Sequence, residues 1–360
     1  IDAPPERRAE MLAALRKQWS EQYGAASLAA VTAGARAASI AATAPIGERI
    51  ERAAELVQRL QEAPASGSRA AAALRSLAAF GPDLPAVLER LIEERHIVLP
   101  DAVYHEVLPA FGKTFVALDE LASPDVQERR RAANQLAALA DETPLGGLAV
   151  MRLSELGANE SDTLVLNALF RAISSDAREP AIRLAYAALG HGAADVRRMA
   201  ADYLAAHPSP EHARLLLEAL NDTNYAVVLA SVRALGHRGM LNDPAPLEHL
   251  LTTTDRRLRL AVANSLAQLG AASGPQSLQL LSKDSDAETR LKAAQLMGEL
   301  GDRRYMETLI GLLDDDTLGV RLAALAALCQ VAGRDVAADA ENPPTSTLDR
   351  IERWKRWWSH

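Results

Sequence analysis

The sequence predicts an all-α fold in which helical hairpins stack into a right-handed superhelix, and three observations support that prediction. Alanine and leucine are abundant, only 4% of the residues are aromatic, and the β-branched runs that indicate strands are missing. Apolar residues recur at spacings of three, four and seven, which place them on one face of a helix. The same pattern returns every 31 residues through the C-terminal half. Such a period is typical of repeat proteins, in which each unit buries its apolar face only against its neighbours.

Residues 1–122 predict an N-terminal helical region of irregular or degenerate repeats. Glycines and prolines interrupt the pattern at positions typical of helix ends, namely Gly24, Pro45, Pro64, Gly81, Pro82 and Pro100. We therefore expect about five or six helices in this region. The clearest amphipathic segment is made of Ile46, Ile50, Ala53, Ala54, Val57 and Leu60. The alanine-rich segment 25–44 predicts a helix that packs closely against a neighbour.

Residues 123–342 predict the regular array. One reference residue can be chosen in each repeat so that successive ones lie 31 positions apart: Arg197, Val228, Arg259, Arg290 and Arg321. The residues three and four positions later are mostly small, which lets a neighbouring helix approach. The residue seven positions later is large and apolar in every copy: Leu204, Leu235, Leu266, Met297 and Leu328. Degenerate copies have their reference residues at Leu166 and, after an irregular spacing of 37, at Arg129, so the array has at most seven members.

Each repeat is expected to be a helix, a turn and a second helix. A glycine eleven positions after the reference residue suits the end of the second helix, as at Gly239, Gly270 and Gly301. Carboxylates before the reference residue suit the capping of a helix start, as at Asp222, Asp255, Asp284, Asp286 and residues 314–316. A shorter apolar helix is expected between the glycine and the acid.

These residues resemble HEAT repeats, especially the short class named after phycobilisome lyases, whose pattern is roughly an acid, Val-Arg, two alanines, a leucine and a glycine. The resemblance covers residues 190–333 well. It implies a HEAT-like solenoid and a non-catalytic protein-binding scaffold or adaptor, as a subunit of a larger complex. The alternative that it implies is a chromophore lyase-like or other small-molecule-handling protein, although no compact motif carries over residue by residue.

Composition and charge narrow the range of partners. The formal net charge of -8 argues against broad attraction to nucleic acid, and no stretch reaches the roughly 18 apolar residues of a membrane span. Nucleic-acid binding, known from glycosylases with similar repeats, would need a continuous basic groove. Because the sequence starts at Ile1, we expect a processed or trimmed soluble chain, cytoplasmic or exported. The single cysteine, Cys329, is interpreted as a buried apolar residue.

Two short motifs invite a catalytic interpretation and fail it. Residues 112–114 read Gly-Lys-Thr, but a phosphate-binding loop needs a glycine five residues earlier, where Val107 stands. His105 is followed by a glutamate, as in a zinc-protease helix, but the second histidine would fall at Pro109. We therefore predict no catalytic residue and no cofactor, and an enzyme stays an unsupported alternative.

Histidines and acids cluster without the spacing of a metal site. Five of the eight histidines fall between residues 191 and 249, but prolines and turns separate them, so most are interpreted as solvent-facing loop residues. The acids at 284–288 and 314–316 lack the glycine and the final glutamate of a calcium loop. We predict no metal.

A partner surface is expected on the outward side of the second helices, where one side chain per repeat forms a row. The residues five positions after the reference are Arg171, Asp202, Arg233, Asn264 and Gln295. Those nine positions after it include His237, Gln268, Glu299 and Gln330. Both rows are polar with mixed hydrogen-bonding character, which suits protein recognition better than phosphate binding. The alternative is an ordinary solvated face.

Residues 343–360 predict a separate tryptophan-rich helix. Leu348, Ile351 and Trp358 lie on one side of it at helical spacing. One interpretation is a cap over the exposed apolar end of the last repeat. The other is docking to a protein partner, or peripheral contact with an anionic membrane, through Arg353, Trp354, Trp357 and Trp358.

Overall fold

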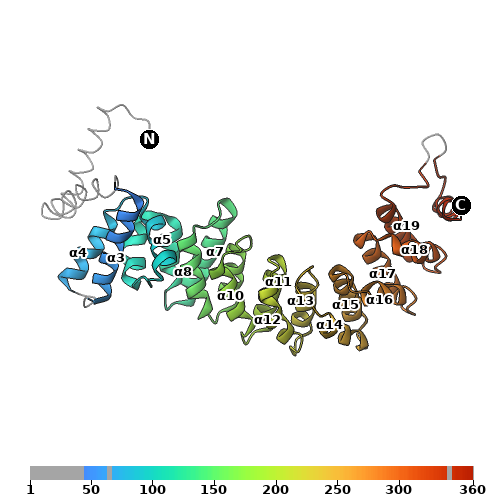
Figure 1. Cartoon of the computed structure of the whole chain (residues 1–360), viewed down its shortest axis with the longest axis horizontal. Coiled ribbons are helices and arrows are strands. Elements are labelled where there is room, and N and C mark those ends of the chain that lie inside the picture. The colour runs from blue at the N-terminus through green and yellow to red at the C-terminus, as the bar shows by residue number, and fades with distance from the viewer. Residues whose placement is uncertain (1–43, 63–66, 339–342, 360) are drawn as a thin grey trace. The chain divides into compact units, whose positions relative to one another are not determined.

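The computed structural model describes residues 44–62, 67–338 and 343–359, and every regular element in these ranges is a helix (Figure 1). The chain divides into two compact units, residues 1–184 and 185–360, and each is described by itself. The prediction of an all-α fold built from repeated helical hairpins is confirmed. The predicted segment 25–44 lies outside the described residues except for its last position.

The first unit contains seven α-helices and two short helical turns in its described part, before a helix that crosses into the second unit. In chain order they are α3 (Ile46–Glu62), α4 (Ser68–Ala78), α5 (Leu84–Arg95), η1 (Val103–Val107), η2 (Leu108–Phe111), α6 (Lys113–Leu121), α7 (Val126–Glu142), α8 (Gly147–Ala158) and α9 (Thr163–Ala172), followed by α10 (Glu179–Leu189). The amphipathic stretch predicted from Ile46 forms α3, which buries Ile50, Ala53, Val57 and Leu60 in a core shared with α4 and α5.

The second unit continues the hairpins and ends in a separate helix. Its elements are α11 (Ala194–Ala206), η3 (Pro210–His212), α12 (Ala213–Ala219), α13 (Tyr225–Leu235), α14 (Ala245–His249), η4 (Leu250–Thr252), α15 (Arg256–Leu269), α16 (Ser273–Leu281), α17 (Ala287–Leu300), η5 (Arg303–Tyr305), α18 (Met306–Leu312), α19 (Leu318–Ala332) and α20 (Thr347–Trp358). The second helices of successive repeats are α11, α13, α15, α17 and α19. Each of them contacts the next one directly.

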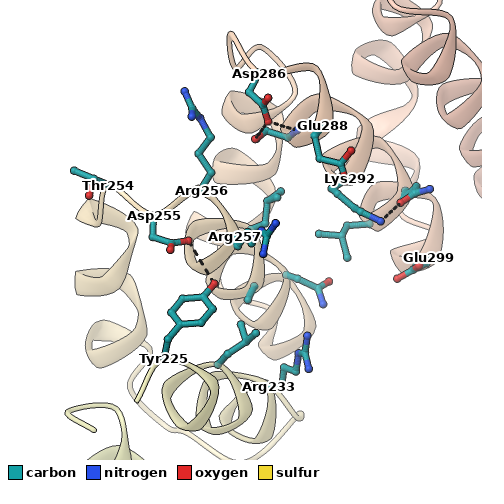
Figure 2. A pocket seen from close by; sticks show the side chains of 17 residues that line it. Tyr225, Arg233, Thr254, Asp255, Arg256, Arg257, Asp286, Glu288, Lys292 and Glu299 are labelled. Atoms are coloured by element: carbon teal, nitrogen blue, oxygen red, sulfur yellow. Dashed lines mark hydrogen bonds between the residues drawn. The ribbon is translucent and has the colours of Figure 1, made fainter. Parts of the chain in front are cut away.

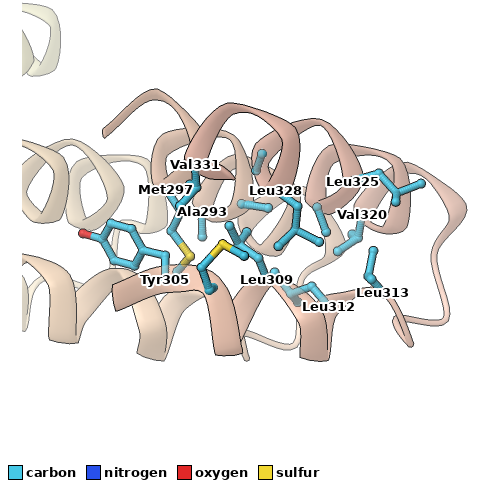
Figure 3. Packing of buried hydrophobic residues seen from close by; sticks show 14 of the residues in the cluster. Ala293, Met297, Tyr305, Leu309, Leu312, Leu313, Val320, Leu325, Leu328 and Val331 are labelled. Carbon is cyan, nitrogen blue, oxygen red and sulfur yellow. The ribbon is translucent and has the colours of Figure 1, made fainter. Parts of the chain in front are cut away.

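The repeat register predicted from the sequence matches the buried positions. All five large residues at the seventh position, from Leu204 to Leu328, have 0% exposure. Figure 3 shows how Met297 and Leu328 meet Leu309 between the helices of the last two repeats. Small residues set the helix spacing, because a Cβ added at Gly298 would lie 2.8 Å from the Cα of Ala327.

The reference arginines connect neighbouring repeats. Arg290 donates through Nη1 to the backbone carbonyl oxygens of residues 284 and 285, and through Nε and Nη2 to the carboxylate of Asp315 in the next repeat, at 2.7 and 2.9 Å. Arg197 makes the same set of bonds, with Asp222 as its acid. Arg129 repeats the arrangement inside the first unit, with Glu160. The irregular copy therefore keeps the same connection.

These bonds between arginines and the next repeat, the arginine ladder, correct part of the prediction that the carboxylates before each reference residue cap a helix start. Asp255 and Asp286 do cap α15 and α17, accepting from the backbone N–H of Leu258 and Thr289 at 2.9 Å. The carboxylates of Asp222, Asp284 and Asp315 accept from the backbone N–H two residues later, just before the helix, and are also ion-paired with arginines of the preceding repeat. The guanidinium bonds lower the pKa of Asp222 and Asp315 below the usual aspartate value.

The prediction that a glycine ends the second helix of a repeat is confirmed for two of the three glycines. Gly270 and Gly301 end α15 and α17 in the left-handed conformation, with φ of 85° and 64°. Gly239 also has a positive φ, but α13 already ends at Leu235, so this glycine lies in the turn that follows.

Candidate protein-binding groove

An open groove of about 1100 Å³ crosses three consecutive second helices of the second unit, α13, α15 and α17 (Figure 2). Its lining includes Tyr225 and Leu229 from α13, Leu260 from α15, and Leu296 from α17. Since helices of three successive repeats each supply side chains, the groove depends on the 31-residue stacking and could not exist in a single hairpin.

Four of the predicted partner-binding residues meet in this groove: Arg233, Asn264, Gln295 and Glu299. The other members of the two rows do not line it: Arg171, Asp202, His237, Gln268 and Gln330. Arg171 belongs to α9 in the first unit and is ion-paired with Asp141 at 3.6 Å. Asp202 is paired along its own helix with Arg198 at 2.6 Å. All nine side chains are exposed or partly exposed, as a surface row requires.

The apolar floor of the groove was missed by the sequence analysis. Leu229 and Leu260 line the groove and lie one position after the reference residue. Leu291 and Leu322 occupy the same position in the next two repeats but do not line the groove. These four residues, the leucine row, repeat at the same 31-residue spacing as the core, so the signal was present in the sequence. It is easily overlooked, because a leucine beside a reference residue looks like one more core position.

Hydrogen bonds at the start of α15 and α17 fix one edge of the groove. The Tyr225 hydroxyl donates to Oδ1 of Asp255 at 3.4 Å and so connects two neighbouring repeats. Burial raises the pKa of Tyr225 and the Asp255 carboxylate adds to the rise, so the phenol stays protonated. On α17, Oδ2 of Asp286 accepts from both the backbone N–H and the hydroxyl of Thr289, which lowers the pKa of Asp286.

Charges are distributed unevenly across the groove. Among the described residues, Arg233 and Arg257 have no carboxylate within ion-pair distance, although both guanidinium groups are close enough to Tyr225 to oppose the rise in its pKa. Figure 2 shows that Arg256 points away from them, and it is ion-paired with Asp284 at 3.1 Å.

The opposite side of the groove is mainly acidic. Glu288 and Glu299 on α17 have no hydrogen-bonding or ion-pair partner among the described side chains. Lys292 lies between them on the same helix and donates to Oε1 of Gln295 at 3.2 Å. The groove therefore has two unpaired guanidinium groups toward α13 and α15, and two carboxylates against one ammonium group on α17.

The motifs set aside in the sequence have structural roles. Gly112, at φ 137°, precedes α6 and leaves the Gly-Lys-Thr triplet at an ordinary helix start. His105 is hydrogen-bonded to Asp119. In the described part of the chain, no group of three or more histidine, cysteine or acidic residues could hold a metal ion. Cys329 is half-buried rather than fully buried.

One histidine departs from the prediction of solvent-facing loops. His212 is only 3% exposed, and its Nδ1 and the Tyr186 hydroxyl lie 2.7 Å apart. Its Nε2 lies 2.9 Å from the carbonyl oxygen of His207. Burial lowers the pKa of His212, which favours the neutral ring.

The C-terminal helix α20 packs on the last repeat, which corrects half of the docking hypothesis. Trp354 is 0% exposed, lies in the core formed with α18 and α19, and donates through Nε1 to Asp335 at 3.2 Å. Arg353 is largely buried and ion-paired with Asp349. These two side chains are therefore held by contacts within the chain, whereas Trp357 and Trp358 are 41% and 44% exposed.

No helix within the described ranges is long and apolar enough to cross a membrane. Besides Arg353, two further basic residues of α20 are ion-paired within the chain, Arg350 with Asp335 and Lys355 with Asp314. This pairing weakens the case for membrane contact through α20.

Comparison with known proteins identifies the repeats. The family model of HEAT repeats matches residues 182–267 and 274–340. No curated protein matches the sequence. The complex of CpcE and CpcF of phycocyanin lyase from Nostoc sp. PCC7120 is similar over 69% of this chain and 94% of that chain, at 20% identity and a TM-score of 0.42.

Two further solved structures are similar to part of this chain. An engineered protein matches 62% of this chain and 97% of its own, at 18% identity and a TM-score of 0.34. Human deoxyhypusine hydroxylase in complex with glycerol matches 69% and 96%, at 18% identity and a TM-score of 0.30. At these identities the likenesses concern the fold alone.

Proposed function

We propose that this chain, which is a HEAT-repeat protein, is a non-catalytic scaffold or adaptor that binds a protein partner in the groove across α13, α15 and α17. The observation that supports this most is the composition of the groove, in which Leu229, Leu260 and Leu296 lie among charged and amide side chains, several of them unpaired. Protein interfaces commonly combine an apolar centre with a polar rim. A solvated surface would not need these leucines.

The charge pattern favours protein over nucleic acid. A phosphate backbone binds to runs of basic side chains and gains affinity with every phosphate neutralised. Here two free arginines face two free glutamates, and the whole chain has a net charge of -8. A partner with charges of both signs fits this surface better than a polyanion.

The proposal is tested by a double substitution in the groove. The Arg233→Ala/Asn264→Ala variant should lose partners that the wild-type chain retains in a pull-down from source cells, quantified by mass spectrometry. Both side chains point into the groove and neither has a structural hydrogen bond among the described contacts, so the variant should keep its fold. Circular dichroism and thermal unfolding would check that it does.

The matched control places two alanines on the opposite layer. Gln276 in α16 and Glu307 in α18 are exposed residues of first helices. The Gln276→Ala/Glu307→Ala variant should retain every partner that the wild type retains. Equal recovery by both double variants would reject the groove as the binding surface, and recovery of no specific protein by the wild type would reject the scaffold function.

The chromophore-handling alternative is favoured by one observation, the size of the groove. Its volume of about 1100 Å³ could hold a large organic ligand. Its charged and open walls suit such a ligand less well than an enclosed apolar pocket would. A tetrapyrrole absorption band in the purified protein would support this alternative over the scaffold.

A further inference from the structure

The repeat register of the groove residues continues onto α19 of the last repeat, although α19 supplies no side chain to the lining of the groove. Second helices α13, α15, α17 and α19 carry equivalent side chains three positions before, one after and five after the reference residue. In order along the array they are Tyr225, Leu229 and Arg233; Arg256, Leu260 and Asn264; Ala287, Leu291 and Gln295; and Leu318, Leu322 and Ala326. The middle member is leucine in every repeat, and the outer members change from charged or polar to apolar toward α19.

The α19 part is an exposed apolar stripe. Leu318 and Leu322 are 53% and 45% exposed, and Ala326 is also exposed. Their spacing of four residues aligns them along one face of α19. Single exposed leucines are common on protein surfaces, but two aligned exposed leucines on the helix that packs beside a groove helix indicate a binding surface.

The four helices therefore offer four different environments in a fixed order. At one end are the unpaired guanidinium groups of Arg233 on α13 and of Arg257 at the start of α15. Leu260 of α15 comes next, with 8% exposure, followed by Glu288 and Glu299 of α17. The apolar stripe of α19 ends the series.

The spacing of the helices sets the spacing of a ligand. Packed helices lie about 8–10 Å apart, and three residues of a peptide in the extended polyproline II conformation span about 9 Å and return the side chain to the same face. One repeat therefore corresponds to about three residues of an extended peptide. Such a peptide has unpaired backbone N–H and C=O groups, which the side-chain amides of Asn264 and Gln295 can bond, whereas a helical peptide would bond these groups to itself.

We propose that the groove binds an extended peptide segment of a partner protein that carries an acidic, an apolar, a basic and an apolar side chain at every third position. The acidic side chain lies near Arg233 and Arg257, the first apolar one over Leu260, the basic one beside Glu299, and the last apolar one on the Leu318–Leu322 stripe of α19, next to the groove. This inference rests on the proposed protein-binding function and specifies the chemistry of the partner.

The test uses a synthetic ten-residue peptide labelled with fluorescein. It carries glutamate, leucine, lysine and leucine in that order, each pair separated by two serines, and its binding to the full chain is measured by fluorescence anisotropy. Charge reversal in the Arg233→Glu/Arg257→Glu variant should weaken binding about tenfold, since two attractive contacts become repulsive. A second peptide, with lysine in place of the glutamate, should bind this variant more tightly than it binds the wild type.

Two controls separate specific contacts from general charge. Lys283→Glu/Arg303→Glu changes the net charge by the same amount at exposed positions outside the groove, and should leave binding of the first peptide unchanged. Leu322→Ser should weaken binding of the first peptide about fivefold but should not affect a peptide whose last leucine is replaced by serine.

Specific outcomes would overturn the proposal. Failure of the first peptide to bind the wild type, equal binding by the wild type and the charge-reversed variant, or an equal loss in the Lys283→Glu/Arg303→Glu control would each reject the peptide chemistry. The pull-down with Arg233→Ala/Asn264→Ala is independent of this result. Partners lost in that pull-down would leave the protein-binding function standing even if the synthetic peptide fails.

Discussion

The groove and the C-terminal helix α20 both carry arginine and large apolar side chains, but these side chains have different surroundings. In the groove, Arg233 and Arg257 have no carboxylate partner in the described structure, and Leu229 is only partly buried. In α20, Arg350 and Arg353 are ion-paired and Trp354 is fully buried. The same residue types thus serve partner binding in one region, as we propose, and closure of the repeat stack in the other.

The largest effect on stability is expected from Trp354→Ala. Removing this fully buried side chain leaves a cavity between α20 and the last repeat, and should reduce the free energy of unfolding by about 3–5 kcal/mol. Thermal or urea unfolding would measure the loss. Trp357→Ala is the matched control, because its 41% exposed ring should cost much less. Equal losses in the two variants would contradict the assignment of α20 as a cap held by Trp354.

A smaller, pH-dependent effect is expected from the arginine ladder. Arg290→Ala removes the two bonds that Arg290 donates to the Asp315 carboxylate, and should reduce the free energy of unfolding at neutral pH by about 1–2 kcal/mol. Because Arg290 lowers the pKa of Asp315 in the folded chain, the stability from this pair is present above the usual aspartate value of about 3.9 and is lost as the pH falls through the lower folded value.

The two chains should therefore converge in acid. Urea unfolding of the wild type and of Arg290→Ala at neutral pH and near pH 3 would show whether the difference shrinks. A difference that stays constant over this range would mean that Arg290 stabilises the fold through its bonds to the backbone carbonyl oxygens rather than through Asp315.

The smallest effect on stability is expected from the groove itself. Arg233→Ala and Arg257→Ala remove side chains with no carboxylate partner among the described residues, so each should change the free energy of unfolding by no more than about 0.5 kcal/mol. Urea unfolding would detect a larger change. A loss comparable with that of Arg290→Ala would show that these arginines support the fold, and would sharply weaken the comparison between the groove and the ladder.

Much of the fold could be predicted because the repeat makes each position visible several times. The fully buried residues at the seventh position, such as Leu204 and Met297, follow from periodicity alone. The groove was predicted in part, since Arg233, Asn264, Gln295 and Glu299 lie in it. The leucine row was not, because a sequence pattern does not separate an apolar residue that faces a neighbouring helix from one that faces a groove.

The sequence by itself determined the helical class, the 31-residue register and the residues buried in every repeat, since these depend on local periodicity. The tertiary structure decided which charges are satisfied. Arg256 and Arg257 are adjacent arginines at the start of α15, yet Arg256 is ion-paired with Asp284 and Arg257 has no carboxylate partner among the described residues. The reason is that pairing depends on where the next repeat places its carboxylates, which helix stacking fixes and local sequence does not.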